Sequence, residues 1–245
     1  MNDIKVIFED NSVLVIDKPA GITVNKSDTT KDEPTIQDFV EEKLPDTFKD
    51  KKIDHDFYNR AGIVHRIDKE TSGILLVAKT LEDFENLQAQ FKDRVVQKTY
   101  IALVHGNVLP SEGEIAVPVG RLPWNRERFG VLAGGKEAST KYKVLESFTT
   151  KIDKRNKEIL TLLELSPKTG RTHQIRVHLK YFNHPIFGDY LYAGRKTSRK
   201  DRDILPRVFL HAKNISFKHP KSGEVVSFES KLPYELTSTI SRLKD

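Results

Sequence analysis

The sequence contains no cysteine among its 245 residues. This absence excludes disulfides, thiolate nucleophiles and every zinc or iron–sulfur site that depends on cysteine ligands. The chain also lacks any run approaching the ~18 apolar residues that a membrane-spanning helix needs. Its first ten residues, MNDIKVIFED, have neither the basic start nor the apolar stretch of a signal peptide. We therefore expect a protein of a reducing compartment, located in the cytoplasm.

Composition and charge fit a soluble globular protein with a basic surface. Hydrophobic residues make up 37% of the chain and charged residues 31%, and the net charge is +6. The charge is uneven, because residues 25–60 hold ten acids and seven bases, whereas no acid occurs between Glu164 and Asp189. A basic region suits a polyanion such as RNA. An isoelectric point of about 9.2 is also common among proteins that bind no nucleic acid, so charge alone does not decide.

Local patterns predict an α+β fold with a largely antiparallel sheet, since strands outnumber helices and their joins resemble hairpins. Asp10-Asn11 is a turn-forming pair between two apolar runs, which indicates a hairpin. Helical periodicity and capping residues predict helices over 35–44, from Thr80 to 91, over 172–182 and over 233–243. Further strands are expected at 74–78, 98–105, 138–148, 159–166, 214–218 and 225–229. Residues 193–207 carry six bases and two acids, and we expect an exposed basic loop there.

The segment HRIDKETSG, residues 65–73, is a polar loop between apolar Val64 and Ile74. A tight loop that feeds a buried strand is a usual place for catalytic groups. Asp68 lies between Arg66 and Lys69, cationic neighbours that favour its ionised form. An ordinary turn or salt bridge explains the loop equally well on these grounds.

Further motifs change this balance. The chain contains, in order, DKPAG at 17–21, HRIDKETSG at 65–73, KTYIALVHG at 98–106, TGRTHQIRVH at 169–178, HPIFGDYLY at 184–192 and LHAKNISFKHP at 210–220. Together they resemble the RluA family of pseudouridine synthases, from about Lys5 to Pro220. Two departures are visible: Ile67 stands where leucine is more usual, and ITVNKS after Gly21 lacks the His-Pro often found there.

The resemblance implies the pseudouridine synthase fold, with a mixed but largely antiparallel sheet flanked by helices and a catalytic cleft across the sheet. We expect a single catalytic domain over 1–245 with no separate N-terminal RNA-binding domain, although many members of the family have a small one. The resemblance also implies isomerisation of uridine to pseudouridine in structured RNA, ribosomal or transfer, with Asp68 as the essential carboxylate. Asp68 can attack the ribose, as carboxylates do in retaining glycosidases, or take a ribose proton on a glycal route. The sequence leaves both routes open.

The resemblance assigns roles to other residues. Arg176 matches the arginine that pairs with the catalytic aspartate, and a guanidinium fork keeps a carboxylate ionised. Tyr100 matches the tyrosine that stacks on the target uracil, and Ile175 is expected to line the apolar wall of the uracil pocket.

RNA contacts follow from the same resemblance. A uridine in folded RNA must be flipped out to reach a buried carboxylate, at a cost of a few kcal/mol. Arg66 matches the residue that occupies the vacated space or holds flanking phosphates, and Lys18 and Arg171 are expected to contact phosphates. We expect RNA as the partner and a monomeric protein.

No metal and no cofactor are expected. The histidines near the motifs lack HExxH spacing, cysteine is absent, and no Walker or dinucleotide glycine pattern occurs. Two rival functions remain. One is an RNA-binding module without activity. The other is a glycosidase or nucleoside hydrolase, for which Asp17 or Asp189 would supply the second carboxylate.

Overall fold

The structure is a computed structural model that describes residues 4–27, 33–48, 55–153 and 156–244. The chain divides into two compact units. The first unit comprises Met1–Gln97 and Ala212–Lys231, and the second comprises Lys98–His211 and Leu232–Asp245. The expectation of one catalytic domain over 1–245 stays a prediction.

The first unit is built on strands in the order β1, β2, β3, β10 and β11. Their bounds are Lys5–Glu9, Val13–Lys18, Ser72–Ala78, Leu210–Lys218 and Val225–Glu229, the first two residues of β10 belonging to the second unit. β1 pairs antiparallel with β2, which confirms the hairpin predicted at Asp10-Asn11, and β10 pairs antiparallel with β11, which confirms the strands predicted at 214–218 and 225–229. The Asp10 carboxylate tightens the first turn by accepting 2.8 Å hydrogen bonds from the backbone N–H groups of Ser12 and Val13.

β3 is the buried centre of this unit. All seven of its residues are buried, which confirms the predicted strand enclosed on both faces. Gly73 adopts φ 113°, and a Cβ there would collide with the carbonyl oxygen of Ala212 in β10. Only glycine permits this close approach at the start of the strand that follows the Asp68 loop.

Helices α1, α2 and α3 of the first unit span Ile36–Lys43, Asp56–Asn59 and Leu81–Lys92. Two of them confirm predictions, because Thr35 and Thr80 cap α1 and α3 by accepting hydrogen bonds from the backbone of Asp38 and Asp83. α3 buries Phe84 and packs against β3. It thereby braces the strand that the candidate loop enters.

The second unit has an antiparallel sheet in the order β4, β9, β8 and β5, bounded as Gln97–His105, Asn156–Pro167, Ser139–Asp153 and Glu112–Ala116, with Gln97 assigned to the first unit. A separate hairpin joins β6, Val119–Leu122, to β7, Asn125–Val131. The core includes Leu103, Leu163 and Phe209, each 0% exposed. The predicted α+β class with a largely antiparallel sheet is confirmed, while the cleft stays a prediction.

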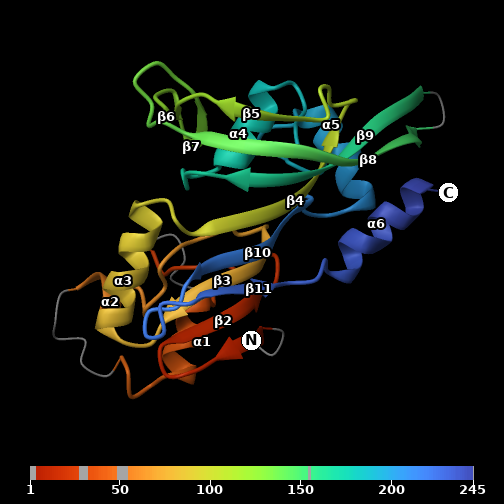
Figure 1. Cartoon of the computed structure of the whole chain (residues 1–245). Coiled ribbons are helices and arrows are strands. Elements are labelled where there is room, and N and C mark those ends of the chain that lie inside the picture. The colour runs from red at the N-terminus through yellow and green to blue at the C-terminus, as the bar shows by residue number, and fades with distance from the viewer. Residues whose placement is uncertain (1–3, 28–32, 49–54, 154–155, 245) are drawn as a thin grey trace. The chain divides into compact units, whose positions relative to one another are not determined.

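Helices α4, α5 and α6 of the second unit span Gln174–Tyr181, Arg195–Ile204 and Tyr234–Lys244 (Figure 1). α4 begins two residues later than predicted, because His173 has φ 56°, a left-handed conformation outside the helix.

Residues 193–207 were expected to form an exposed basic loop. The exposed bases are present, but the loop conformation was wrong, since α5 occupies most of this segment. The side chains of Ser198 and Asp201 face inward and are buried. α5 has no apolar stripe, so hydrophobic periodicity could not reveal it.

Candidate active site

The Asp68 loop is a tight turn, as the sequence indicated. The backbone N–H of Thr71 donates to the carbonyl of Asp68 at 3.0 Å, immediately before β3. Ile67 is 6% exposed, whereas Arg66 is exposed and Asp68 is half-buried. The apolar side chain therefore anchors the loop, and Arg66 is left facing solvent on one side of it.

The DKPAG motif is hydrogen-bonded to this loop through the backbone carbonyl of Lys69. The carbonyl oxygen of Lys69 accepts from the backbone N–H of Gly21 at 2.8 Å and from the Nζ of Lys18 at 3.0 Å. Lys18 also donates to the carbonyls of Pro19 and Ile22, at 2.9 and 2.8 Å. Two motifs whose bonded residues Lys18 and Lys69 lie 51 positions apart in sequence thus meet within the first unit.

The burial of Lys18 weighs against the predicted contact with an RNA phosphate. Lys18 is 0% exposed, and its ammonium donates to three backbone carbonyls. A buried ammonium is tolerated only when its donors are satisfied in this way. Lys18 therefore supports the backbone that carries Asp68.

His65 supports the same loop from its other side. Its Nε2 accepts a 3.0 Å hydrogen bond from the backbone N–H of Leu76, and its ring stacks on Phe91 with centroids 5.0 Å apart. An accepting Nε2 assigns the proton of the neutral ring to Nδ1. Within the described ranges, no group of three or more His, Asp or Glu side chains is arranged to hold a metal ion.

Arg176 in the second unit forms a planar fork with Asp189. Its Nε donates to Oδ2 and its Nη2 to Oδ1, both at 2.8 Å, and the side chains are 6% and 0% exposed. Asp189 Oδ1 also accepts from the backbone N–H groups of Leu191 and Tyr192, at 3.0 and 3.2 Å. The guanidinium lies 5.1 Å from the ring centroid of Tyr192. No pattern in the sequence indicates this fork, although Asp189 is the first acid after Glu164.

This environment weighs against the glycosidase reading. A glycosidase acid must hold a proton that it can donate. Both oxygens of Asp189 accept hydrogen bonds from the guanidinium of Arg176 and the side chain is 0% exposed, so the carboxylate presents no accessible oxygen to a sugar. Asp17, the other candidate, accepts from the hydroxyl of Ser230 at 2.8 Å.

Gln174 organises the TGRTHQIR segment, a role that the sequence did not reveal. Its Oε1 accepts from the hydroxyl of Thr169 at 2.6 Å and from the backbone N–H of Arg171 at 3.0 Å, and its Nε2 donates to Thr140 Oγ1 at 3.0 Å. Arg171 is half-buried, and its Nε donates to the carbonyl of Glu137 at 3.1 Å. The many hydrogen-bond donors of this motif were the signal that could have indicated this role. A glutamine at the start of a helix can form hydrogen bonds with the backbone groups of the preceding turn.

Tyr100 and Ile175 both pack in the core region of the second unit. Ile175 belongs to the core and is 7% exposed. Tyr100 of β4 is half-buried and packs against this core. Lys98 lies two residues before Tyr100 on the same face of β4, and its Nζ approaches Gly170 of the TGR segment. Burial lowers the pKa of Lys98 to about 8.

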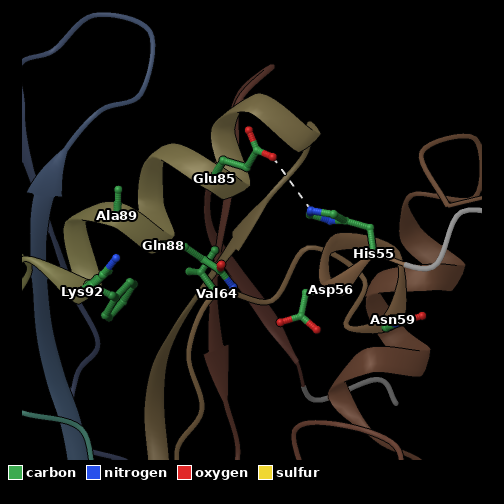
Figure 2. Close-up of a pocket in the computed structure, with 9 residues that line it drawn as sticks. His55, Asp56, Asn59, Val64, Glu85, Gln88, Ala89 and Lys92 are labelled. Atoms are coloured by element: carbon green, nitrogen blue, oxygen red, sulfur yellow. Dashed lines mark ion pairs between the residues drawn. The ribbon is translucent and has the colours of Figure 1, made fainter.

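A pocket of about 760 Å³ opens beside α2 and α3 in the first unit, as Figure 2 shows. Its polar lining includes His55, Asp56, Asn59, Glu85, Gln88 and Lys92. The ring of His55 lies 3.8 Å from a carboxylate oxygen of Glu85. Two acids against one lysine do not suit a phosphate, so the pocket does not extend the candidate site.

Comparison with known proteins identifies the family. Residues 12–181, more than half of the chain, match the RNA pseudouridylate synthase family. The chain belongs to this family. Within it, the chain is 38% identical to a ribosomal large subunit pseudouridine synthase D of Nitrosomonas europaea, over 99% of its own length and 66% of that protein's. It is 37% identical to a protein of the same name from Neisseria meningitidis serogroup B, over 98% of its own length and 61% of that protein's.

The pseudouridylate synthase fold is confirmed by solved structures. Human RNA Pseudouridylate Synthase Domain Containing 1 aligns with a TM-score of 0.72 at 24% identity, covering 97% of this chain and 87% of that one. The chain spans about two thirds or less of the two bacterial relatives. Among the described residues, no helix has the length and apolar character needed to cross a membrane.

Proposed function

We propose that this member of the pseudouridylate synthase family isomerises uridine to pseudouridine in structured RNA, with Asp68 as the essential carboxylate. The observation that carries the proposal is the Asp68 turn, which Lys18 and Gly21 fasten from one motif while β3 holds its far end. Rigid support of this kind preorganises a catalytic group. The family match supplies the reaction class.

The reaction breaks the bond between the ribose C1′ and the uracil nitrogen, turns the base, and bonds carbon-5 to the same C1′. Asp68 either attacks C1′ to form a covalent ester or removes a ribose proton on a glycal route, and both routes remain open. In this proposal Arg176 is the arginine that acts with Asp68, Tyr100 stacks on the uracil and Ile175 forms an apolar contact.

The substrate is proposed to be RNA with the target uridine flipped out of its stack. Arg66 is exposed beside Asp68 and is suited to the vacated space or a flanking phosphate, and Arg171 is a second proposed phosphate contact. Large-subunit ribosomal RNA is the first candidate because relatives carry that name, and transfer RNA is the second. We further propose a cytoplasmic monomer that needs neither metal nor cofactor.

The test incubates the purified protein with ribosomal and transfer RNA from cells that lack it, and maps pseudouridine before and after. We expect product with the wild type and none with Asp68→Asn, which keeps the side-chain shape but removes the charge. The matched control is Asp93→Asn, the same change at an exposed position of the first unit, which should form product like the wild type. The proposal would be overturned if Asp68→Asn formed as much product as the wild type, or if the wild type formed no product on either RNA class.

Release of free uracil is measured in the same reactions. An isomerase keeps the base in the RNA, whereas a hydrolase liberates it. Free uracil in place of pseudouridine would restore the glycosidase reading.

A further inference from the structure

Helix α5 presents a dense cationic face. Within α5, all of which the structure describes, Arg195, Lys196 and Arg199 are exposed, and Lys200 and Arg202 are partly exposed. Asp203 is the one exposed acid of this helix, since Asp201 is buried. At 100° per residue, the three exposed cations fall within one side of the helix. We propose that this cationic face binds backbone phosphates of the RNA substrate, an inference that rests on the proposed function.

The cationic face is held on a rigid base. Asp201 Oδ2 accepts from the backbone N–H of Gly188 at 2.9 Å and lies 2.9 Å from Nε2 of His105. Arg202 donates from Nε to the carbonyl of Gly188 at 3.0 Å, and its guanidinium lies 4.8 Å from the ring centroid of Tyr190. α5 therefore forms hydrogen bonds with both the backbone N–H and the backbone C=O of Gly188. A helix whose backbone is held in this way loses little backbone freedom when its side chains bind, unlike a charged loop.

The anchor point connects α5 to Arg176. Gly188 directly precedes Asp189, the carboxylate that forms the fork with Arg176. Gly188 has φ 77°, and a Cβ there would collide with the carbonyl oxygen of Arg207, so the segment has little room to shift. A phosphate bound on α5 is thus attached to the segment that positions the arginine of the candidate site.

The pattern of charges within α5 also favours a polyanion. Arg195 and Lys196 lie in the first turn, where the helix dipole is positive and cations are unfavourable. Arg195 and Arg199, like Lys196 and Lys200, are four residues apart, a spacing at which like charges repel. Phosphates would relieve both penalties.

An anionic membrane is a poorer occupant than RNA. Helices that lie on a membrane bury an apolar face among the lipids in addition to binding headgroups. None of the exposed residues of α5 is apolar, so the helix offers charged side chains without the exposed apolar face that inserts among lipids.

The test compares two triple variants of the full chain. The first is Arg195→Gln/Lys196→Gln/Arg199→Gln, in which glutamine preserves helix propensity. The matched control, Lys5→Gln/Lys218→Gln/Lys231→Gln, removes the same charge from three exposed positions of the first unit. Binding to large-subunit ribosomal RNA is measured at several salt concentrations, together with pseudouridine formation. A far-UV circular dichroism spectrum like that of the wild type confirms folding of each variant.

We expect the α5 variant to bind RNA at least 10-fold more weakly at low salt. Each lost phosphate contact should make the plot of log affinity against log salt shallower by about one, so the slope should change by about two to three. The control should change both quantities much less. Equal losses in the two variants would mean that only net charge matters and would overturn the inference.

The remaining outcomes separate this inference from the proposed function. If the α5 variant binds RNA and forms pseudouridine as well as the wild type does, the proposed role of the cationic face is refuted and the proposed function stands. Absence of product from the wild type, combined with the expected loss of binding, would refute the function and leave the RNA surface standing. Vesicles of phosphatidylcholine and phosphatidylserine form a further arm. Loss of vesicle binding by the α5 variant, with RNA binding intact, would assign the face to lipid instead.

Discussion

Replacing Asp189 with asparagine should destabilise the second unit strongly. The change leaves the guanidinium of Arg176, 6% exposed, without its counter-ion in a site where Asp189 is 0% exposed. An asparagine can return one acceptor oxygen, but its amide N–H groups then face the N–H groups of Arg176. Removing one partner of a buried ion pair typically costs about 3–5 kcal/mol. That loss is a large part of the 5–15 kcal/mol that stabilises ordinary domains, so we expect a marked fall in the unfolding midpoint.

Urea denaturation followed by far-UV circular dichroism measures this effect. The only tryptophan, Trp124, is 76% exposed, so its fluorescence would report poorly on the core. The midpoint should fall while the slope of free energy against urea stays unchanged, because the folded surface is the same.

A double variant gives the decisive comparison. Arg176→Met/Asp189→Leu removes both charges and fills the space with apolar atoms, so no uncompensated charge remains. It should lose less stability than Asp189→Asn alone, which reveals strong coupling between the two positions. A loss below 1 kcal/mol for Asp189→Asn, or a double variant that loses the sum of both single changes, would refute the reasoning.

Three further predictions concern stability. Lys18→Met keeps the length of the side chain but leaves three backbone carbonyls without their donor, so it should cost about 3 kcal/mol in urea unfolding, and a loss below 1 kcal/mol would contradict the assigned role. Thr80→Ala removes the cap of α3 and should cost about 1–2 kcal/mol, whereas Thr80→Ser keeps the accepting oxygen and should restore most of it. Lys98 has a folded pKa of about 8, below its value of 10.5 in an unfolded chain, so the unfolded state binds more protons between these values. Stability should therefore rise with pH from about 8 upward, and Lys98→Met should flatten the difference between urea midpoints at about pH 7.5 and 9.5; an equal rise in the variant would argue against burial of Lys98.

The sequence predicted the elements whose signals are local. Alternating or continuous apolar residues predicted β3 and β4, and the threonine caps predicted where α1 and α3 begin. The same logic failed for α5, whose buried face consists of Ser198 and Asp201 rather than apolar side chains. Polar anchoring has no period that a sequence alone can display.

The sequence indicated candidate residues of the site, but it did not indicate which side chains and backbone groups they contact. The turn at Asp68 follows from local chemistry, and the motifs indicated Arg176. The fork with Asp189 depends on two segments that meet only in the folded chain, and the burial of Lys18 runs against the usual exposure of lysine. Such pairings belong to tertiary structure, where composition and spacing carry little information.

The Asp68 turn depends on the backbone of position 69 and hardly on its side chain. The carbonyl of Lys69 holds the neighbouring motif, while its ammonium points outward to an exposed ion pair with Glu33 at 2.6 Å. Exposed ion pairs contribute little to stability, so the residue type at this position can be exchanged at small cost. Position 69 is therefore a handle for protein engineering: its charge can be kept, neutralised or reversed one residue from the candidate carboxylate, with the scaffold of the turn left in place.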